Sequence, residues 1–174
     1  DLWILNKTHK KRNGFFVDFG ATDGKTINNT FLLETEYEWQ GIVSEPNIIY
    51  HSDLEKNRKC IIVKDAVFKT SNEFVDFNLV MSSDLSTIDG YGLEDEHKTV
   101  RENHKTIKVK TISLLDLLVN NSSPKDIDYL SIDTEGSEYD ILFAFFLNKR
   151  SENYKIHYIT VEHNFTSHRE KIYD

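Results

Sequence analysis

The sequence predicts an α/β fold built on a doubly wound, mostly parallel sheet. Apolar, strand-like runs alternate along the chain with segments of helical periodicity, which is the pattern that βαβ units produce. The 174 residues are enough for one domain with its own core, and we expect a single domain over residues 1–174. Two stretches in the middle alternate polar with apolar side chains, and they predict an antiparallel, hairpin-like insertion.

The expected elements follow one another along the chain. Parallel strands are predicted at 15–19, 41–44, 60–64, 128–132 and 158–161, and the two alternating strands at 73–80 and 106–112. Helices are predicted over 26–35 and 47–56, from Ser113 and from Ser137 onward, and near 167–174. Ile27 belongs to the apolar side of the first helix, and Pro46 suits the first turn of the second.

Residues 81–105 differ in character from the rest of the chain. They are polar and charged, and rich in Ser, Asp, Glu and His. A segment of this length without a clear pattern is usually a functional lid or an irregular surface insertion, and the sequence is compatible with both.

The composition is that of an ordinary globular protein, with 39% hydrophobic and 29% charged residues. The net charge of −8 argues against a nucleic-acid partner, because phosphate binding needs a basic face. No apolar run approaches the roughly 18 residues of a membrane helix, so we expect no membrane partner. Cys60 is the only cysteine, which excludes an internal disulfide; these features together favour a cytoplasmic location.

The most informative stretch is the first predicted strand and the loop after it. The strand carries a carboxylate, Asp18, and the loop contains Gly20 and Gly24. Glycine lets the backbone turn tightly and approach a ligand, and such a loop forms a nucleotide-sized crevice at the carboxyl edge of the sheet. Glu45 follows the next strand, where a ribose would lie, and one carboxylate can accept hydrogen bonds from both hydroxyls of a diol.

Polar residues follow four of the predicted strands. They are Asp18, Glu45, the pair Asp133 and Glu135, and the pair Glu162 and His163. Because ligands in open α/β sheets bind outside the carboxyl ends of the strands, these residues together predict an active site at that edge.

The spacing of the loop distinguishes two cofactors. The dinucleotide fingerprint is Gly-x-Gly-x-x-Gly, whereas this chain has Gly20-x-x-x-Gly24 with no middle glycine. A pyrophosphate would be repelled by Asp18, but a zwitterionic methionine with a sulfonium would not. The sequence therefore favours S-adenosylmethionine. An NAD(P)-type oxidoreductase and a non-catalytic cofactor-binding protein remain as alternatives.

The chain resembles the FkbM-type family of class I S-adenosylmethionine-dependent methyltransferases, which have a Rossmann-like fold. The matching segments come in the family's order and span most of residues 14–164: FFVDFGATDGKTINNTFLLE, EWQGIVSEPN, KDAV, IDYLSIDTEGSEYDIL and ITVEHN. The most specific is the Ile-Asp-x-Glu-Gly-x-Glu sequence within residues 132–138. The family core usually closes with a further antiparallel strand pair, so the resemblance implies that this chain is truncated at the C-terminal edge of its sheet.

The resemblance also implies roles for individual residues. It implies cofactor binding by Asp18, Gly20, Ala21, Gly24, Glu45, Pro46, Asp65, Ala66 and Asp133. Within this set, Glu45 would take the ribose hydroxyls, and Asp65 and Ala66 would lie near the adenine. The turn with Asp133 and Glu135 would lie beside the reacting methyl group. Ser131 departs from the pattern, because many members have a lysine there.

The expected reaction is O-methylation of a hydroxyl on a small molecule or glycan. His163 is the first candidate for a general base because its ordinary pKa suits proton transfer, and Asp133 and Glu135 are the rivals. We assign no metal site, although Asp133, Glu135, Glu138 and Glu162 carry oxygen ligands that Mg²⁺ or Ca²⁺ accepts. The negative charge favours a neutral or cationic acceptor, and no oligomeric state is predicted.

Overall fold

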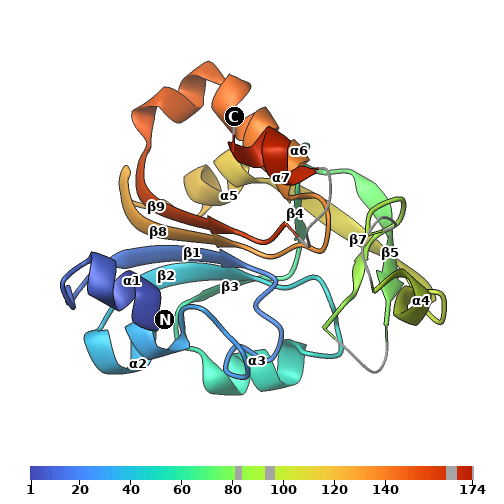
Figure 1. The fold of residues 1–174 in the computed structure, drawn as a ribbon, viewed down its shortest axis with the longest axis horizontal. Coiled ribbons are helices and arrows are strands. Elements are labelled where there is room, and N and C mark those ends of the chain that lie inside the picture. The colour runs from blue at the N-terminus through green and yellow to red at the C-terminus, as the bar shows by residue number, and fades with distance from the viewer. Residues whose placement is uncertain (81–83, 93–96, 164–167, 174) are drawn as a thin grey trace.

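The computed structural model describes residues 1–80, 84–92, 97–163 and 168–173. A five-stranded parallel sheet lies at its centre (Figure 1), with the strands in the order β3-β2-β1-β8-β9. They are β1 (Phe15–Phe19), β2 (Gln40–Ser44), β3 (Ile61–Val63), β8 (Asp126–Ile132) and β9 (Lys155–Val161). β1 pairs with β2 on one side and with β8 on the other. The strand order therefore reverses beside β1, where open α/β sheets form their ligand crevice.

Helices cover both faces of this sheet (Figure 1). One face carries α1 (Leu2–Lys7), α2 (Phe31–Tyr37) and α3 (His51–Asn57), and the other carries α5 (Leu114–Asn120) and α6 (Glu138–Leu147). A 3₁₀ helix, Lys149–Asn153, leads into β9, and α7 (His168–Tyr173) packs against α6. The predicted α/β class with a mostly parallel, doubly wound sheet is confirmed.

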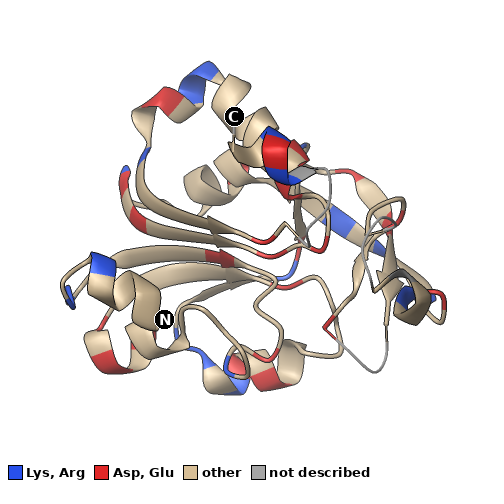
Figure 2. Ribbon diagram, in the orientation of Figure 1, with Lys and Arg blue, Asp and Glu red and all other residues tan. Residues whose placement is uncertain are grey.

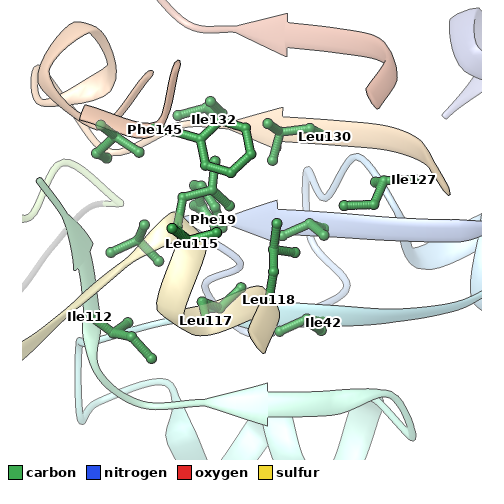
Figure 3. Close-up of a cluster of buried hydrophobic side chains, with 14 residues drawn as sticks. Phe19, Ile42, Ile112, Leu115, Leu117, Leu118, Ile127, Leu130, Ile132 and Phe145 are labelled. Atoms are coloured by element: carbon green, nitrogen blue, oxygen red, sulfur yellow. The ribbon is translucent and has the colours of Figure 1, made fainter. Parts of the chain in front are cut away.

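Neighbouring residues of a strand face opposite helical layers. Val17 and Phe19 of β1 pack with α5 and α6 in one cluster of buried side chains (Figure 3), whereas Phe16 packs with α1, α2 and α3 in a second cluster. Both faces of the strand are buried, and for this reason every residue of the strand except Asp18 is apolar. The predicted start of α5 is also confirmed, since the Ser113 side chain accepts a hydrogen bond from Asp116 N at 3.1 Å.

A second, smaller sheet lies beside the carboxyl edge of the first, in the order β4-β7-β5-β6. Its strands are β4 (Ala66–Phe68), β5 (Phe74–Leu79), β6 (Thr87–Ile88) and β7 (Lys105–Ser113), and α4 (Lys98–Arg101) precedes β7. The predicted antiparallel pair is β5 with β7. The insertion is larger than the sequence predicted, because β4 pairs in parallel with β7 and β6 adds an antiparallel strand.

Two predicted helices begin later than expected. The first was expected over 26–35, but α2 starts at Phe31, and Ile27 has a φ of +49° with 92% of its surface exposed. Asp23 explains the difference, because its carboxylate accepts hydrogen bonds from the backbone of Lys25 and Thr26 and holds a turn instead.

The second predicted helix, 47–56, is α3 and begins at His51. Asn47 makes the same kind of turn, since its side chain accepts a hydrogen bond from Ile49 N at 3.0 Å, and Pro46 therefore precedes a turn rather than a helix.

The helix α1 was not predicted at all. No helix in the described part of the chain is long and apolar enough to cross a membrane. The cytoplasmic location stays a prediction.

Candidate active site

A crevice lies at the carboxyl edge of the central sheet, beside β1. Its walls come from the loops after β1, β2 and β8 and from residues of the smaller sheet. Acidic positions recur along these loops (Figure 2). Among the residues singled out from the sequence, the crevice is lined by Gly20, Glu45, Pro46, Ala66, Asp133 and Glu135. The structure thus brings together residues from four separate segments, and of the four predicted strand ends it places Glu45 and the pair Asp133 and Glu135 in the crevice wall.

Gly20 marks the point where the loops of three strands meet. Its backbone N–H donates to Ser44 O at 3.1 Å, which joins the loop after β1 to the end of β2. Its φ is +76°, and a Cβ at this position would lie 1.9 Å from Asp133 O. Only glycine fits between the loop after β1 and the loop after β8 without displacing the backbone.

Asp18 lies behind the crevice wall rather than on it. Its carboxylate is buried and accepts hydrogen bonds from Thr30 Oγ1 at 2.7 Å and from Asn28 Nδ2 at 3.1 Å. Burial raises the pKa of this carboxyl. Asp18 therefore holds the loop that carries Gly20, and it is not among the described residues that line the crevice.

Ala21 and Gly24, like Asp18, lie behind the crevice wall. Ala21 is buried in the core cluster on the α1–α3 face. Gly24 has a φ of +77° and packs against Leu54 and Arg58, where a Cβ would come within 2.6 Å of both. These two residues shape the loop from behind, and neither is among the described residues of the crevice wall.

Arg58 is a residue of this region that the sequence did not indicate. Its buried guanidinium donates from Nη1 to Gly24 O at 3.1 Å and to Asn28 Oδ1 at 2.9 Å, and from Nη2 to Thr30 Oγ1 at 3.0 Å. Nε pairs with Glu34 Oε2 at 2.5 Å. Arg58 follows a helix in a polar stretch, Lys56-Asn57-Arg58-Lys59, and nothing local distinguishes it from Lys56 and Lys59, which are exposed.

Glu45 lines the crevice and is almost completely buried, with 4% of its surface exposed. Its two carboxylate oxygens accept hydrogen bonds from backbone N–H groups, Oε2 from Thr22 at 2.8 Å and Oε1 from Asn47 at 2.7 Å. Burial is the largest influence on this group and raises its pKa to about 7. Each oxygen keeps a further lone pair, so the carboxylate can also accept two hydrogen bonds from a ligand.

Asp65 and Ala66 follow β3, and only one of them faces the crevice. Ala66 lines it together with Val67, Phe77 and Ile88, so this part of the wall is apolar. The Asp65 carboxylate instead lies 4.0 Å from Lys110 Nζ on β7, and its carbonyl accepts a hydrogen bond from Ser44 Oγ.

Three carboxyl groups converge at the end of β8. Asp133, Glu135 and Glu162 each offer an oxygen, and these atoms lie within 4.8 Å of one another. Burial, a hydrogen bond to Glu162 and the neighbouring charges raise the pKa of Asp133 to about 10. Glu162 Oε2 is buried and accepts no hydrogen bond from an N–H or a hydroxyl of the described chain. The same three oxygens are also close enough to hold a divalent cation.

Glu138 belongs to the same acidic sequence, but its role is structural. Its carboxylate accepts hydrogen bonds from the backbone of Thr134 at 2.9 Å and of Gly136 at 3.0 Å. These contacts fix the turn between β8 and α6. Glu135 has a φ of +59° in that turn, a conformation that is costly for a residue with a Cβ.

The smaller sheet and the segment before α4 contact the loops around the crevice. Thr87 Oγ1 donates to Glu135 O at 2.9 Å, and Arg101 pairs with the Glu135 carboxylate. On the other side, Asn47 Nδ2 donates to Ser86 Oγ and Tyr50 OH to Asp84 Oδ1. The described part of residues 81–105 thus forms a wall of the site; residues 81–83 and 93–96 lie outside the described residues.

His163 follows Glu162 after the end of β9 and is partly buried. It is not among the described residues that line the crevice. Its assignment as the general base stays a prediction.

An open parallel sheet with a glycine turn and a strand-end carboxylate at its switch point places this protein in the class of Rossmann-like α/β proteins. Residues 18–172 match the family described as Methyltransferase FkbM domain, and the chain belongs to this family. It is therefore a methyltransferase, and its family implies a cofactor of the S-adenosylmethionine type. A search of curated proteins and a search of solved structures each found no match.

Proposed function

We propose that the protein transfers a methyl group from S-adenosylmethionine to a hydroxyl of a small molecule or glycan. The observation that carries the proposal is Glu45, a buried carboxylate on the crevice wall at the sheet's switch point, next to the Gly20 loop. The missing middle glycine of the dinucleotide fingerprint argues against an NAD(P)-dependent oxidoreductase, in agreement with the family match.

The residues of the crevice fit this cofactor. The Glu45 carboxylate suits the ribose diol, since each of its oxygens has capacity beyond its backbone hydrogen bond. The apolar wall of Ala66, Val67, Phe77 and Ile88 suits a flat base. Because Gly20 has no Cβ, the loop after β1 lies in direct contact with the turn after β8. That turn carries the acidic cluster, whose negative charge suits a cationic sulfonium.

When bound, the cofactor supplies an activated methyl group and a neutral leaving group, so the protein need not protonate the leaving group. The chain's own residues have two tasks. The crevice wall must align the acceptor oxygen with the methyl carbon, and proximity of this kind contributes several kcal/mol, up to about 7–11 in the best cases. A side chain must also take the proton of the acceptor hydroxyl, which adds about 10²–10⁴-fold.

The candidates for proton transfer follow the ends of β8 and β9. Asp133 forms a hydrogen bond with Glu162, and this contact together with burial raises the pKa of Asp133 to about 10, so Asp133 holds its proton at neutral pH. Glu135 forms an ion pair with Arg101. We keep His163, which follows Glu162, as the first candidate for the base.

Calorimetric titration with S-adenosylhomocysteine tests the cofactor assignment, with NAD as the comparison ligand. We expect micromolar binding of the first and none of the second. Glu45→Ala should abolish that binding, and Glu38→Ala should leave it unchanged, because Glu38 is an exposed carboxylate of a surface ion pair. Equal binding by wild type and Glu45→Ala would refute the ribose assignment.

A second experiment tests the reaction. Transfer of a labelled methyl group to a panel of glycans and small hydroxyl compounds identifies an acceptor. With that acceptor, His163→Ala should bind S-adenosylhomocysteine as wild type does and transfer the methyl group at least about 10²-fold more slowly. A transfer rate within twofold of wild type would move the role of base to Asp133 or Glu135.

A further inference from the structure

We propose that Arg101 is a positioning residue of this site. It ties the segment 84–92 of the insertion to the turn after β8, and thereby holds two walls of the crevice in the arrangement that binds the cofactor. The inference rests on the proposed function, because it concerns the same crevice.

The contacts of Arg101 reach three separate places. Nε donates to Leu85 O at 2.9 Å and Nη1 donates to Gly92 O at 2.8 Å. Nη2 donates to Glu135 Oε2 at 2.5 Å. Only 6% of the Arg101 side chain and 10% of the Glu135 side chain are exposed, so this ion pair is shielded from solvent and from salt.

Two of these partners of Arg101, Leu85 and Glu135, lead directly to the crevice wall. Leu85 lies between Asp84 and Ser86, which line the crevice, and Glu135 lines it from the other side. Thr87 Oγ1 adds a hydrogen bond to Glu135 O. The two walls also touch at their backbones, since a Cβ on Gly136 would lie 2.8 Å from Gly92 N. A displacement of either segment would therefore change the shape of the crevice.

The charge and the fork of arginine both matter here. Glu135 lies in a cluster with Asp133 and Glu162, and the guanidinium supplies the positive charge that compensates its buried carboxylate. Without that charge, repulsion between the carboxylates and the strained φ of Glu135 both favour movement of the turn. A lysine would keep the charge, but a single ammonium cannot reproduce the planar fork that binds three acceptors in different directions.

The first test is the affinity for S-adenosylhomocysteine, measured by calorimetry on the whole chain. Arg101→Met should weaken binding at least tenfold. Arg12→Met is the matched control, because Arg12 also pairs with a carboxylate, Glu38, but on the exposed surface. The control should bind within twofold of wild type. Circular dichroism melts set a working temperature at which each variant is folded.

Arg101→Lys separates positioning from charge alone and also serves if Arg101→Met does not fold. We expect its affinity to be at least fivefold weaker than that of wild type. Hydrogen exchange should become faster in residues 84–92 and 134–138 of this variant, with the amides of β1 and β2 unchanged.

Two results would overturn the inference. One is an affinity of Arg101→Lys within twofold of wild type, which would mean that the fork is not needed. The other is faster exchange throughout the central sheet, which would show a general loss of stability. Failure of the wild-type protein to bind S-adenosylhomocysteine would instead refute the proposed function.

Discussion

Replacement of Gly20 by alanine tests how the crevice is assembled. The added Cβ would lie 1.9 Å from Asp133 O, a backbone atom that cannot swing away. A residue with a Cβ also pays about 1–2 kcal/mol for a φ of +76°. Overpacking in a tight site costs about 1–3 kcal/mol more. We therefore expect Gly20→Ala to lower the free energy of unfolding by about 2–5 kcal/mol, a large part of the roughly 5–15 kcal/mol of a typical domain.

Gly90→Ala is the control that separates the two contributions. Gly90 has a φ of +87°, but nothing lies within 4 Å of the Cβ position, so only the backbone cost applies. Urea denaturation followed by circular dichroism gives the free energy of unfolding for both variants. Gly20→Ala should be less stable than Gly90→Ala by about 1–3 kcal/mol. Equal losses in the two variants would refute the close approach of the loops after β1 and β8.

Three further predictions concern stability. Because burial raises the pKa of Glu45 from 4.5 to about 7, the folded protein holds a proton that the unfolded chain has released between these pH values. Urea titrations should therefore show that Glu45 contributes a fall in stability of at most about 3 kcal/mol as pH rises from about 4.5 to 7, and Glu45→Gln should make the slope shallower by that contribution, while the raised pKa values of Asp18 and Asp133 keep part of the slope. Arg58→Met leaves the Glu34 carboxylate partly buried without its cation and should cost about 3–5 kcal/mol, against less than about 1 kcal/mol for the exposed Arg12→Met; similar losses would contradict this account. Ser113→Ala removes the cap of α5 and should cost about 1 kcal/mol in thermal or urea unfolding, whereas no change would mean that the cap contributes nothing.

The sequence was sufficient where the pattern is local and repeated. The central strands were predicted within a few residues, because their two buried faces require continuous apolar runs. The turns after β1 and β2 were mistaken for helices, since Asp23 and Asn47 use their side chains to hold the backbone in other conformations. Such side-chain hydrogen bonds leave no periodic signal in the sequence.

The residues of the candidate site were likewise predicted only in part. Gly20, Glu45 and Asp133 line the crevice as their positions at strand ends predicted, because parallel strands bring their carboxyl ends to one edge. Asp18 and Gly24 belong to the same sequence motif but lie behind the wall, where they shape the loop. A motif fixes which residues lie near a ligand, but the backbone path decides which of them face it.

The sequence by itself determined the α/β class, the position of the crevice and the methyltransferase family, because these depend on hydrophobic periodicity and on short motifs. Only the tertiary structure decided that Arg58 and Arg101 are buried while Arg12 is exposed. The partner of Arg58 is Glu34, 24 residues away along the chain, and the partner of Arg101 is Glu135, 34 residues away. The pairing of a charge over such a separation depends on how the sheet and its insertion pack, and no local pattern in the sequence encodes it.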